Sequence, residues 1–217
     1  MIPAVLFDLD GTLVDSAPGI LGTFRWVLEQ HNIAPRIPLD TSLIGPPLRV
    51  TTERLVGSED FALVDRLTAS FRERYDSVGA ATTRPYPSYG ETLGAVRQAG
   101  FALLIVTNKR IAPTLQILER NGGTAIYLGV YSPDAFAPSL TSKGAVIARA
   151  IQLHGLDPAR SVYVGDSAED AAAAAANKLA FVAALYGYGS PVTADPAPAG
   201  RISALSELPA QLARLAL

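Results

Sequence analysis

Residues 4–16 read AVLFDLDGTLVDS, and this stretch decides the fold. Its apolar run, which extends over residues 2–9, does not alternate with polar residues, as is typical of a strand that is covered on both faces of a parallel sheet. The run ends in Asp8, Asp10 and Gly11. Ligands of open α/β sheets bind beyond the carboxyl ends of the strands, so we expect the functional site at these residues.

Further strands and helices alternate along the rest of the chain. Strands are predicted at residues 101–107, 161–165 and 180–184, with a weaker one at 125–130. Helices are predicted at residues 91–98, 112–120, 143–154 and 168–176, each ending at a glycine or asparagine that accepts a left-handed conformation. This order predicts right-handed crossovers and an open three-layer α/β fold. Residues 191–200 are predicted to be a loop and residues 206–217 a closing helix.

Helical patterning without a strand interrupts this alternation between Ser16 and Thr83. Two apolar stripes at helical spacing indicate helices with one buried face. The stripes consist of Ile20, Phe24, Val27 and Leu28, and of Val64, Leu67, Phe71 and Tyr75. Ser16 and Ser58 are predicted as N-caps. We therefore predict a core of residues 1–15 and 84–217 and an inserted helical cap of residues 16–83.

Composition and charge exclude several classes of function. The chain has 217 residues, of which 49% are hydrophobic, which is enough for one core and a smaller appended domain. A net charge of -2 gives no basic surplus for a nucleic acid or an anionic membrane surface. The absence of cysteine excludes disulfides, thiolate metal sites and a cysteine nucleophile. With no signal-peptide pattern and no apolar stretch near the roughly 20 residues that span a bilayer, we expect a cytoplasmic protein.

Carboxylates gather where the predicted strands end. Asp8 and Asp10, two apart on an extended chain, point to the same side, and Asp166 follows a neighbouring strand. A dianionic phosphate repels a carboxylate nucleophile, so the two groups need a divalent cation to bring them together. Because magnesium prefers oxygen ligands, the sequence predicts Mg²⁺ as the cofactor of this acidic pocket.

Phosphoryl transfer also needs a fixed cation and neutral hydrogen-bond donors for the charge that spreads over the transferring group. Lys143 begins a predicted helix, and Thr107 and Asn108 end a predicted strand. We therefore expect these three residues to bind phosphate. Asp170 lies in the first turn of a predicted helix, where an acid interacts favourably with the helix dipole.

Four segments together resemble the motifs of the haloacid dehalogenase superfamily, in the order in which that family has them. They are DLDGTL at residues 8–13, Thr107-Asn108, Lys143 and GDSAED at residues 165–170. The resemblance implies a doubly wound, Rossmann-like core with a helical cap inserted after the first motif. It implies that Asp8 forms an aspartyl-phosphate and that Asp10 protonates the leaving group and then activates water.

The same resemblance implies a ligand set for the cofactor. Mg²⁺ is held by the Asp8 carboxylate, the Asp10 main-chain carbonyl and Asp166. Thr107 and Lys143 hold the phosphate, and the position of Asp170 implies that it orients Lys143 or metal-bound water.

Further segments of the sequence resemble one branch of the superfamily. LIGPPL at residues 43–48 and Tyr86-Pro87 resemble phosphoglycolate phosphatases, while YGYGS at residues 186–190 also resembles relatives that dephosphorylate 5′-nucleotides. The chain departs from that branch because Lys143 is not followed by proline and Asn177-Lys178 replaces the usual Ala-Gly or Asn-Gly. We therefore expect a phosphatase acting on a small phosphorylated metabolite. Phosphoglycolate, a sugar phosphate and a 5′-nucleotide are the alternatives, and monomer and homodimer both remain open.

Competing functions make different demands on the sequence. A phosphomutase of the same superfamily would have identical catalytic residues, so only product analysis separates it from a hydrolase. A dehalogenase lacks the second carboxylate that Asp10 supplies, and a phospho-receiver domain is about half as long and has no cap. Nucleotide-binding modules and serine hydrolases need glycine-rich or Gly-x-Ser-x-Gly motifs that the chain does not contain.

Overall fold

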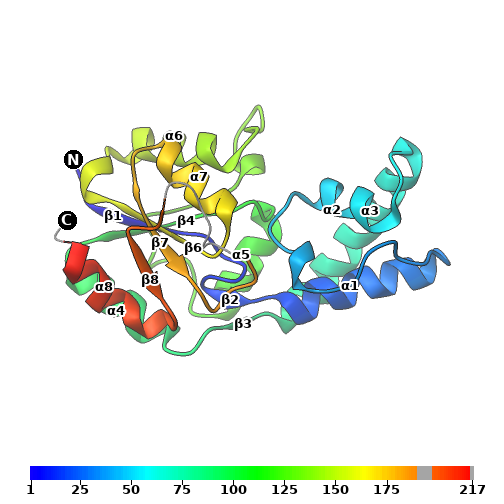
Figure 1. Ribbon diagram of the computed structural model, residues 1–217, viewed down its shortest axis with the longest axis horizontal. Coiled ribbons are helices and arrows are strands. Elements are labelled where there is room, and N and C mark those ends of the chain that lie inside the picture. Colours follow the sequence, from blue (N-terminus) through cyan, green and yellow to red (C-terminus); the bar gives the residue numbers. More distant parts are fainter. Residues whose placement is uncertain (190–196, 216–217) are drawn as a thin grey trace.

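The computed structural model describes residues 1–189 and 197–215, and this part of the chain forms a six-stranded parallel sheet between helices (Figure 1). The strand order is β5-β4-β1-β6-β7-β8. The strands are β1 (Ala4–Phe7), β4 (Ala102–Val106), β5 (Gly129–Tyr131), β6 (Val162–Gly165), β7 (Ala180–Ala184) and β8 (Gly200–Ile202). Every residue of β1 is buried, because this strand pairs in parallel with β4 on one side and β6 on the other.

Helices cover both faces of the sheet, as the doubly wound fold requires. The helices α4 (Tyr89–Gln98), α5 (Ile111–Arg120) and α8 (Leu208–Leu215) pack on one face, where Val5 and Phe7 belong to the buried cluster. The helices α6 (Lys143–His154) and α7 (Ala168–Ala176) pack on the other, with Ala4 and Leu6. The predicted α/β architecture is therefore confirmed. Among the described residues, no helix has the length and apolar character needed to span a bilayer.

A helical lobe stands beside the sheet and corresponds to the predicted cap (Figure 1). It contains α1 (Ala17–Gln30), α2 (Leu48–Val56) and α3 (Phe61–Ser77), with 3-10 turns at Thr41–Leu43 and Gly79–Thr82. The two predicted apolar stripes face each other, with the rings of Phe24 and Phe71 centred 4.4 Å apart. The chain enters and leaves through a short antiparallel pair, β2 (Val14–Asp15) and β3 (Arg84–Pro85). The division at residues 16 and 83 stays a prediction.

Some local expectations were wrong. Asp60, not Ser58, caps α3, because its carboxylate accepts from the main-chain N–H groups of Ala62 and Leu63. Gly200 was assigned to a loop but begins β8, an edge strand of three residues that is too short to show a pattern. The rest of that loop, up to residue 196, lies outside the described residues. The closing helix begins at Leu208, after a 3-10 turn.

Candidate active site

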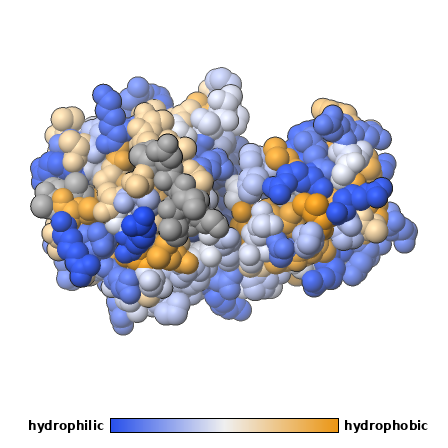
Figure 2. Space-filling view, viewed as in Figure 1, coloured by the Kyte–Doolittle hydropathy of each residue, from blue (hydrophilic) through white to orange (hydrophobic). Residues whose placement is uncertain are grey.

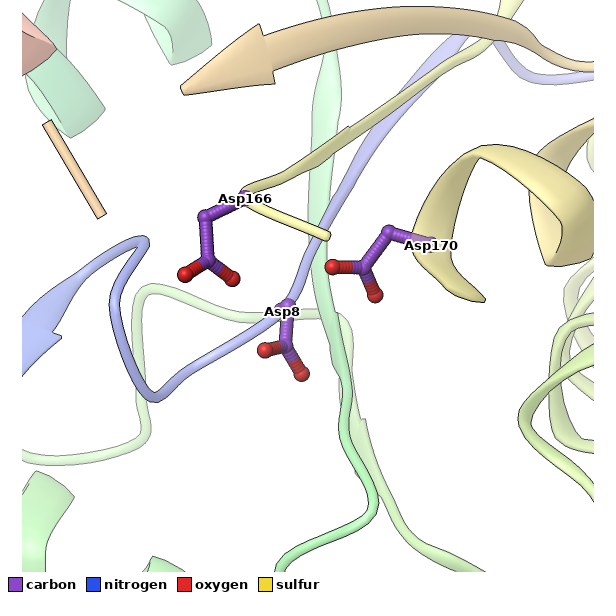
Figure 3. Close-up of side chains that lie close together, drawn as sticks. All are labelled: Asp8, Asp166 and Asp170. Atoms are coloured by element: carbon purple, nitrogen blue, oxygen red, sulfur yellow. The ribbon is translucent and has the colours of Figure 1, made fainter. Parts of the chain in front are cut away.

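Three aspartates from separate segments meet at the carboxyl end of the sheet. Asp8 follows β1, Asp166 follows β6, and Asp170 lies in the first turn of α7. Because β1 and β6 are neighbours, their ends bring these side chains together, and one carboxylate oxygen from each lies within 4.8 Å of the others (Figure 3). All three are buried, with Asp170 0% exposed. The predicted convergence of Asp8 and Asp166 is therefore present in the structure.

Lys143, the first residue of α6, lies between two of these carboxylates. Its Nζ atom is 3.0 Å from Oδ1 of Asp8 and 2.5 Å from Oδ1 of Asp170. The other oxygen of Asp170 accepts hydrogen bonds from the main chain and the hydroxyl of Ser167, which completes a capping box at the start of α7. Both oxygens of Asp170 thus have partners within the protein, so this residue can orient Lys143.

Burial and crowding raise the pKa of two of the carboxyl groups. Burial raises the pKa of Asp8 to about 8, with Lys143 opposing the shift and the charges of Asp170, Asp166 and Asp10 adding to it. Burial, followed by the charge of Asp170, raises the pKa of Asp166 to about 6. Burial lowers the pKa of Lys143, but Asp170 and Asp8 outweigh that effect and raise it well above its ordinary value. Lys143 therefore stays charged.

The main chain fits closely around Asp166. Oδ2 of Asp166 accepts hydrogen bonds from the N–H groups of Tyr188, at 2.6 Å, and Gly189, at 3.1 Å. A Cβ atom at Gly11, where φ is +80°, would overlap the Asp166 carboxylate, and one at Gly187 would overlap its Cβ atom. Only glycine allows this approach at both positions.

This oxygen-rich donor set fits a hard divalent cation. When ionised, the three clustered carboxylates carry more negative charge than Lys143 can balance, and the repulsion between them adds to the effect of burial in raising the pKa values of Asp8 and Asp166. Carboxylate oxygens are the ligands that magnesium prefers. The carboxylates of Asp8 and Asp166 and the main-chain carbonyl of Asp10 are the groups that would hold such an ion.

Asp10 has a different electrostatic partner from Asp8. Both of its carboxylate oxygens lie 3.0 Å from Nζ of Lys109, whose ammonium also lies 4.5 Å from the centre of the Tyr75 ring on α3. The side chain of Lys109 is only 7% exposed, and although burial lowers its pKa, Asp10 and Tyr75 raise it by more. The carboxylate of Asp10 is therefore paired with a lysine and lies outside the acidic cluster.

The two remaining predicted phosphate ligands follow β4. Thr107 is buried, and its hydroxyl accepts from the main chain of Lys109 at 3.3 Å. The side-chain amide of Asn108 donates to Glu169 at 2.8 Å and to the main-chain oxygen of Gly45, in the cap, at 3.3 Å. The side chain of Asn108 thus connects the core to the cap. The predicted phosphate contact of this residue therefore falls to its main-chain N–H group.

A cavity of about 440 Å³ opens over these residues, between the cap and the core. Core residues form its floor, and the cap supplies an apolar wall. The floor includes Asp8, Asp10, Thr107, Lys109 and Lys143, and the wall includes Ile20, Phe24, Leu43, Phe71 and Tyr75. The space-filling view shows an indentation between the two lobes (Figure 2). All the predicted site residues therefore lie on one floor or directly beside it.

Two residues of this region were not predicted. Lys109 directly follows Thr107-Asn108, so its place in the same loop could have identified it. Tyr75 was assigned to the apolar stripe of its helix, and no local signal separates its role from that of Phe71. The pairing of Lys109 with Asp10 joins positions 99 residues apart, which sequence spacing cannot reveal.

Known proteins resemble the chain over most of its length. The family described as haloacid dehalogenase-like hydrolase matches residues 5–184. A phosphoglycolate phosphatase of Agrobacterium fabrum is 32% identical over 191 residues, covering 86% of this chain and 82% of that protein. The tyrosine-protein kinase PtkA of Mycobacterium tuberculosis is 35% identical over 189 residues, and these cover 85% of this chain but 62% of the kinase.

Solved structures have the same architecture. A haloacid dehalogenase-like family hydrolase from Streptococcus pneumoniae superposes with a TM-score of 0.85 at 24% identity, covering 96% of this chain and 97% of that one. The likeness extends over the cap and the core together.

Proposed function

Because the chain belongs to the haloacid dehalogenase-like hydrolase family, we propose that it is a Mg²⁺-dependent phosphatase that hydrolyses a small phosphate monoester through an aspartyl-phosphate on Asp8. The observation that carries this proposal is the buried acidic cluster beneath the cavity, with Lys143 reaching Asp8 at 3.0 Å. The name of the Agrobacterium relative makes phosphoglycolate the first candidate substrate.

The predicted catalytic and phosphate-binding residues each have a role in this reaction. Asp8 attacks phosphorus, and the ester oxygen leaves with a proton from Asp10. Asp10 then takes a proton from the water that attacks the aspartyl-phosphate, which releases phosphate and restores Asp8. Lys143, Thr107 and the main chain of Asn108 hold the phosphoryl oxygens in both steps. A bound Mg²⁺ would supply the positive charge that lets two anions approach each other.

The cap gives the reaction a means of excluding water. Its wall closes one side of the cavity, and Tyr75 brings a cap side chain onto Lys109, next to Asp10. We propose that the cap opens to admit substrate and closes during transfer. A chain with the cap excised that hydrolysed its substrate as fast as the intact protein would contradict this gating.

A larger substrate is the second candidate. A cavity of about 440 Å³ exceeds the needs of a two-carbon phosphate ester and falls in the range of pockets that enclose larger ligands. Sugar phosphates and 5′-nucleotides therefore belong in the same test as phosphoglycolate. Whether the phosphoryl group passes to water or to a second substrate, as in a phosphomutase, is decided by identifying the product.

The experiment is phosphate release from phosphoglycolate, sugar phosphates and 5′-nucleotides, measured with Mg²⁺ and then with a chelator. Wild type is compared with Asp8→Asn, which removes the nucleophile without altering its size. Asp157→Asn is the matched control, because Asp157 caps a 3-10 turn near the opposite end of β1 and asparagine can do the same. Mg²⁺-dependent release that Asp8→Asn alone abolishes is the expected result. Substantial turnover by purified Asp8→Asn would overturn the assignment of the nucleophile.

A further inference from the structure

Tyr188 contacts both the acidic cluster and the linker that leads into the cap. Its main-chain N–H donates to Oδ2 of Asp166 at 2.6 Å. Its hydroxyl donates to Oδ1 of Asp15 at 2.6 Å and accepts from the main-chain N–H groups of Ser16, at 2.7 Å, and Ala17, at 3.0 Å. One residue of the core thus holds a carboxylate at one end and the beginning of α1 at the other.

The hydroxyl of Tyr188 and the carboxylate of Asp15 together cap the start of α1. The first N–H groups of a helix have no partner within the helix, and a side chain at the N-cap position usually accepts from one of them. Ser16 occupies that position in α1 but makes no such bond, and its φ and ψ of -106° and -2° are not those of a usual N-cap. Tyr188, 172 residues along the chain, accepts from the Ser16 N–H and shares the Ala17 N–H with Oδ1 of Asp15, which lies 3.1 Å from that nitrogen. The Tyr188 hydroxyl donates a hydrogen bond to Asp15, so the lone pairs of its oxygen point toward the N–H groups at the start of α1.

Close packing leaves the segment around Tyr188 little room to move. A Cβ atom at Gly187 would overlap both Asp166 and the main-chain oxygen of Gly11, and one at Gly189 would overlap the main chain of Asp166. The neighbouring Tyr186 donates its hydroxyl to the main-chain oxygen of Thr12 at 2.8 Å. Because this segment is packed so closely, a displacement of the Asp166 carboxylate also displaces the side chain of Tyr188.

We propose that Tyr188 is a positioning residue that couples the acidic cluster to the cap, so that a divalent cation held by Asp166 also fixes the start of α1. The inference rests on the proposed function of the cluster as a Mg²⁺ site. Because coupling between two sites is reciprocal, a firmly held α1 also strengthens binding of the cation. The chain would thus favour the closed cap only when the acidic cluster is ready for catalysis.

Amide hydrogen exchange at Ser16 and Ala17 tests the coupling, because both N–H groups donate to the Tyr188 hydroxyl. Ser16 is the direct probe, since the Ala17 N–H also donates to Asp15. Exchange is measured with Mg²⁺ and with a chelator in wild type, in Tyr188→Phe and in Tyr89→Phe. The last is a matched control that loses a hydroxyl pair with Tyr127, at 2.6 Å, within the core.

We expect Mg²⁺ to slow exchange at Ser16 and Ala17 about tenfold in wild type and in Tyr89→Phe. In Tyr188→Phe exchange is faster, and the effect of Mg²⁺ falls to about twofold or less. Calorimetry should then show Mg²⁺ binding about tenfold weaker in Tyr188→Phe than in the control, by reciprocity. A second variant, Asp15→Ala, removes the acceptor that orients the hydroxyl and should weaken the coupling in the same direction. This variant is measured at Ser16, because it also removes one acceptor of the Ala17 N–H.

Equal protection by Mg²⁺ in wild type and Tyr188→Phe, or no protection in wild type, would overturn the coupling. That failure is distinguishable from failure of the proposed function, which is decided by phosphate release. A phosphatase that needs Mg²⁺ but shows no change at Ser16 and Ala17 would retain its function and lose only the role proposed for Tyr188.

Discussion

Replacing Asp8 by asparagine should change how stability depends on pH when no divalent cation is bound. Burial raises the pKa of Asp8 from an ordinary value of 3.8 to about 8. Between these values the folded protein keeps a proton that the unfolded chain releases, so the contribution of Asp8 to stability is complete below pH 3.8 and lost as pH rises through 8. The loss is about 1.4 kcal/mol per pH unit, or about 3 kcal/mol between pH 5 and 7.

The variant lacks this titration, so its free energy of unfolding should rise relative to wild type by up to about 3 kcal/mol over the same range. Lys143 keeps its charge throughout, because its pKa is raised well above the ordinary value, so the loss of its partner adds only a constant offset. Asp166, whose pKa is raised to about 6, titrates in both proteins and cancels to first order.

Urea unfolding of both proteins at pH 5, 6 and 7, in the presence of a chelator, measures this difference. Saturating Mg²⁺ should flatten the wild-type dependence, because a bound cation favours the ionised form of Asp8. Parallel pH dependences of wild type and Asp8→Asn in chelator would refute the reasoning. They would mean that Asp8 is ionised in the folded protein throughout, with Lys143 outweighing burial.

Three further substitutions test other contacts of the site. Lys109→Met removes the partner of Asp10, so kcat for phosphate release should fall about tenfold, with a smaller effect on KM. An unchanged kcat would mean that Lys109 has no role in the reaction. Gly11→Ala forces a Cβ atom against Asp166 at a positive φ, so calorimetry should show Mg²⁺ binding at least about tenfold weaker, and wild-type affinity would contradict the close packing. Ser167→Ala breaks the capping box of α7 and should lower the free energy of unfolding in urea by about 1 kcal/mol. Because the same box holds Asp170 against Lys143, KM should also rise. A loss of stability with unchanged KM would show that this N-cap does not contribute to phosphate binding.

The sequence predicted the elements whose signal is local. Strands buried on both faces appear as continuous apolar runs, so the segments around β1, β4, β6 and β7 could be recognised. The helices α6 and α7 begin and end where predicted, because Ser142 and Ser167 cap them and Gly155 ends the first in a left-handed conformation. The strands β2, β3 and β8 have two or three residues each, too few for any periodicity, and only their partners define them.

The candidate site shows the same difference between features with a local sequence signal and features that depend on the three-dimensional fold. Chemical type, together with position at strand ends for Asp8, Asp10 and Asp166 and at a helix start for Lys143, was the basis for predicting these residues as members of one site. Which carboxylate pairs with which lysine depends on side-chain direction in three dimensions, and no spacing expresses it. Tyr188 illustrates the limit, because a tyrosine in a glycine-rich turn gives no sign that its hydroxyl caps a helix from the other lobe.

The two aspartates of the first motif belong to different electrostatic groups, and this separation supports the different functions proposed for them. Asp8 shares Lys143 with Asp170 and lies beside Asp166, so its group has three carboxylates for one ammonium and an excess of negative charge that a divalent cation balances. The carboxylate of Asp10 is paired one to one with Lys109. In the proposed reaction, the carboxylate that shares its site with the cation is the nucleophile, and the carboxylate paired with Lys109 exchanges protons with the leaving group and with water.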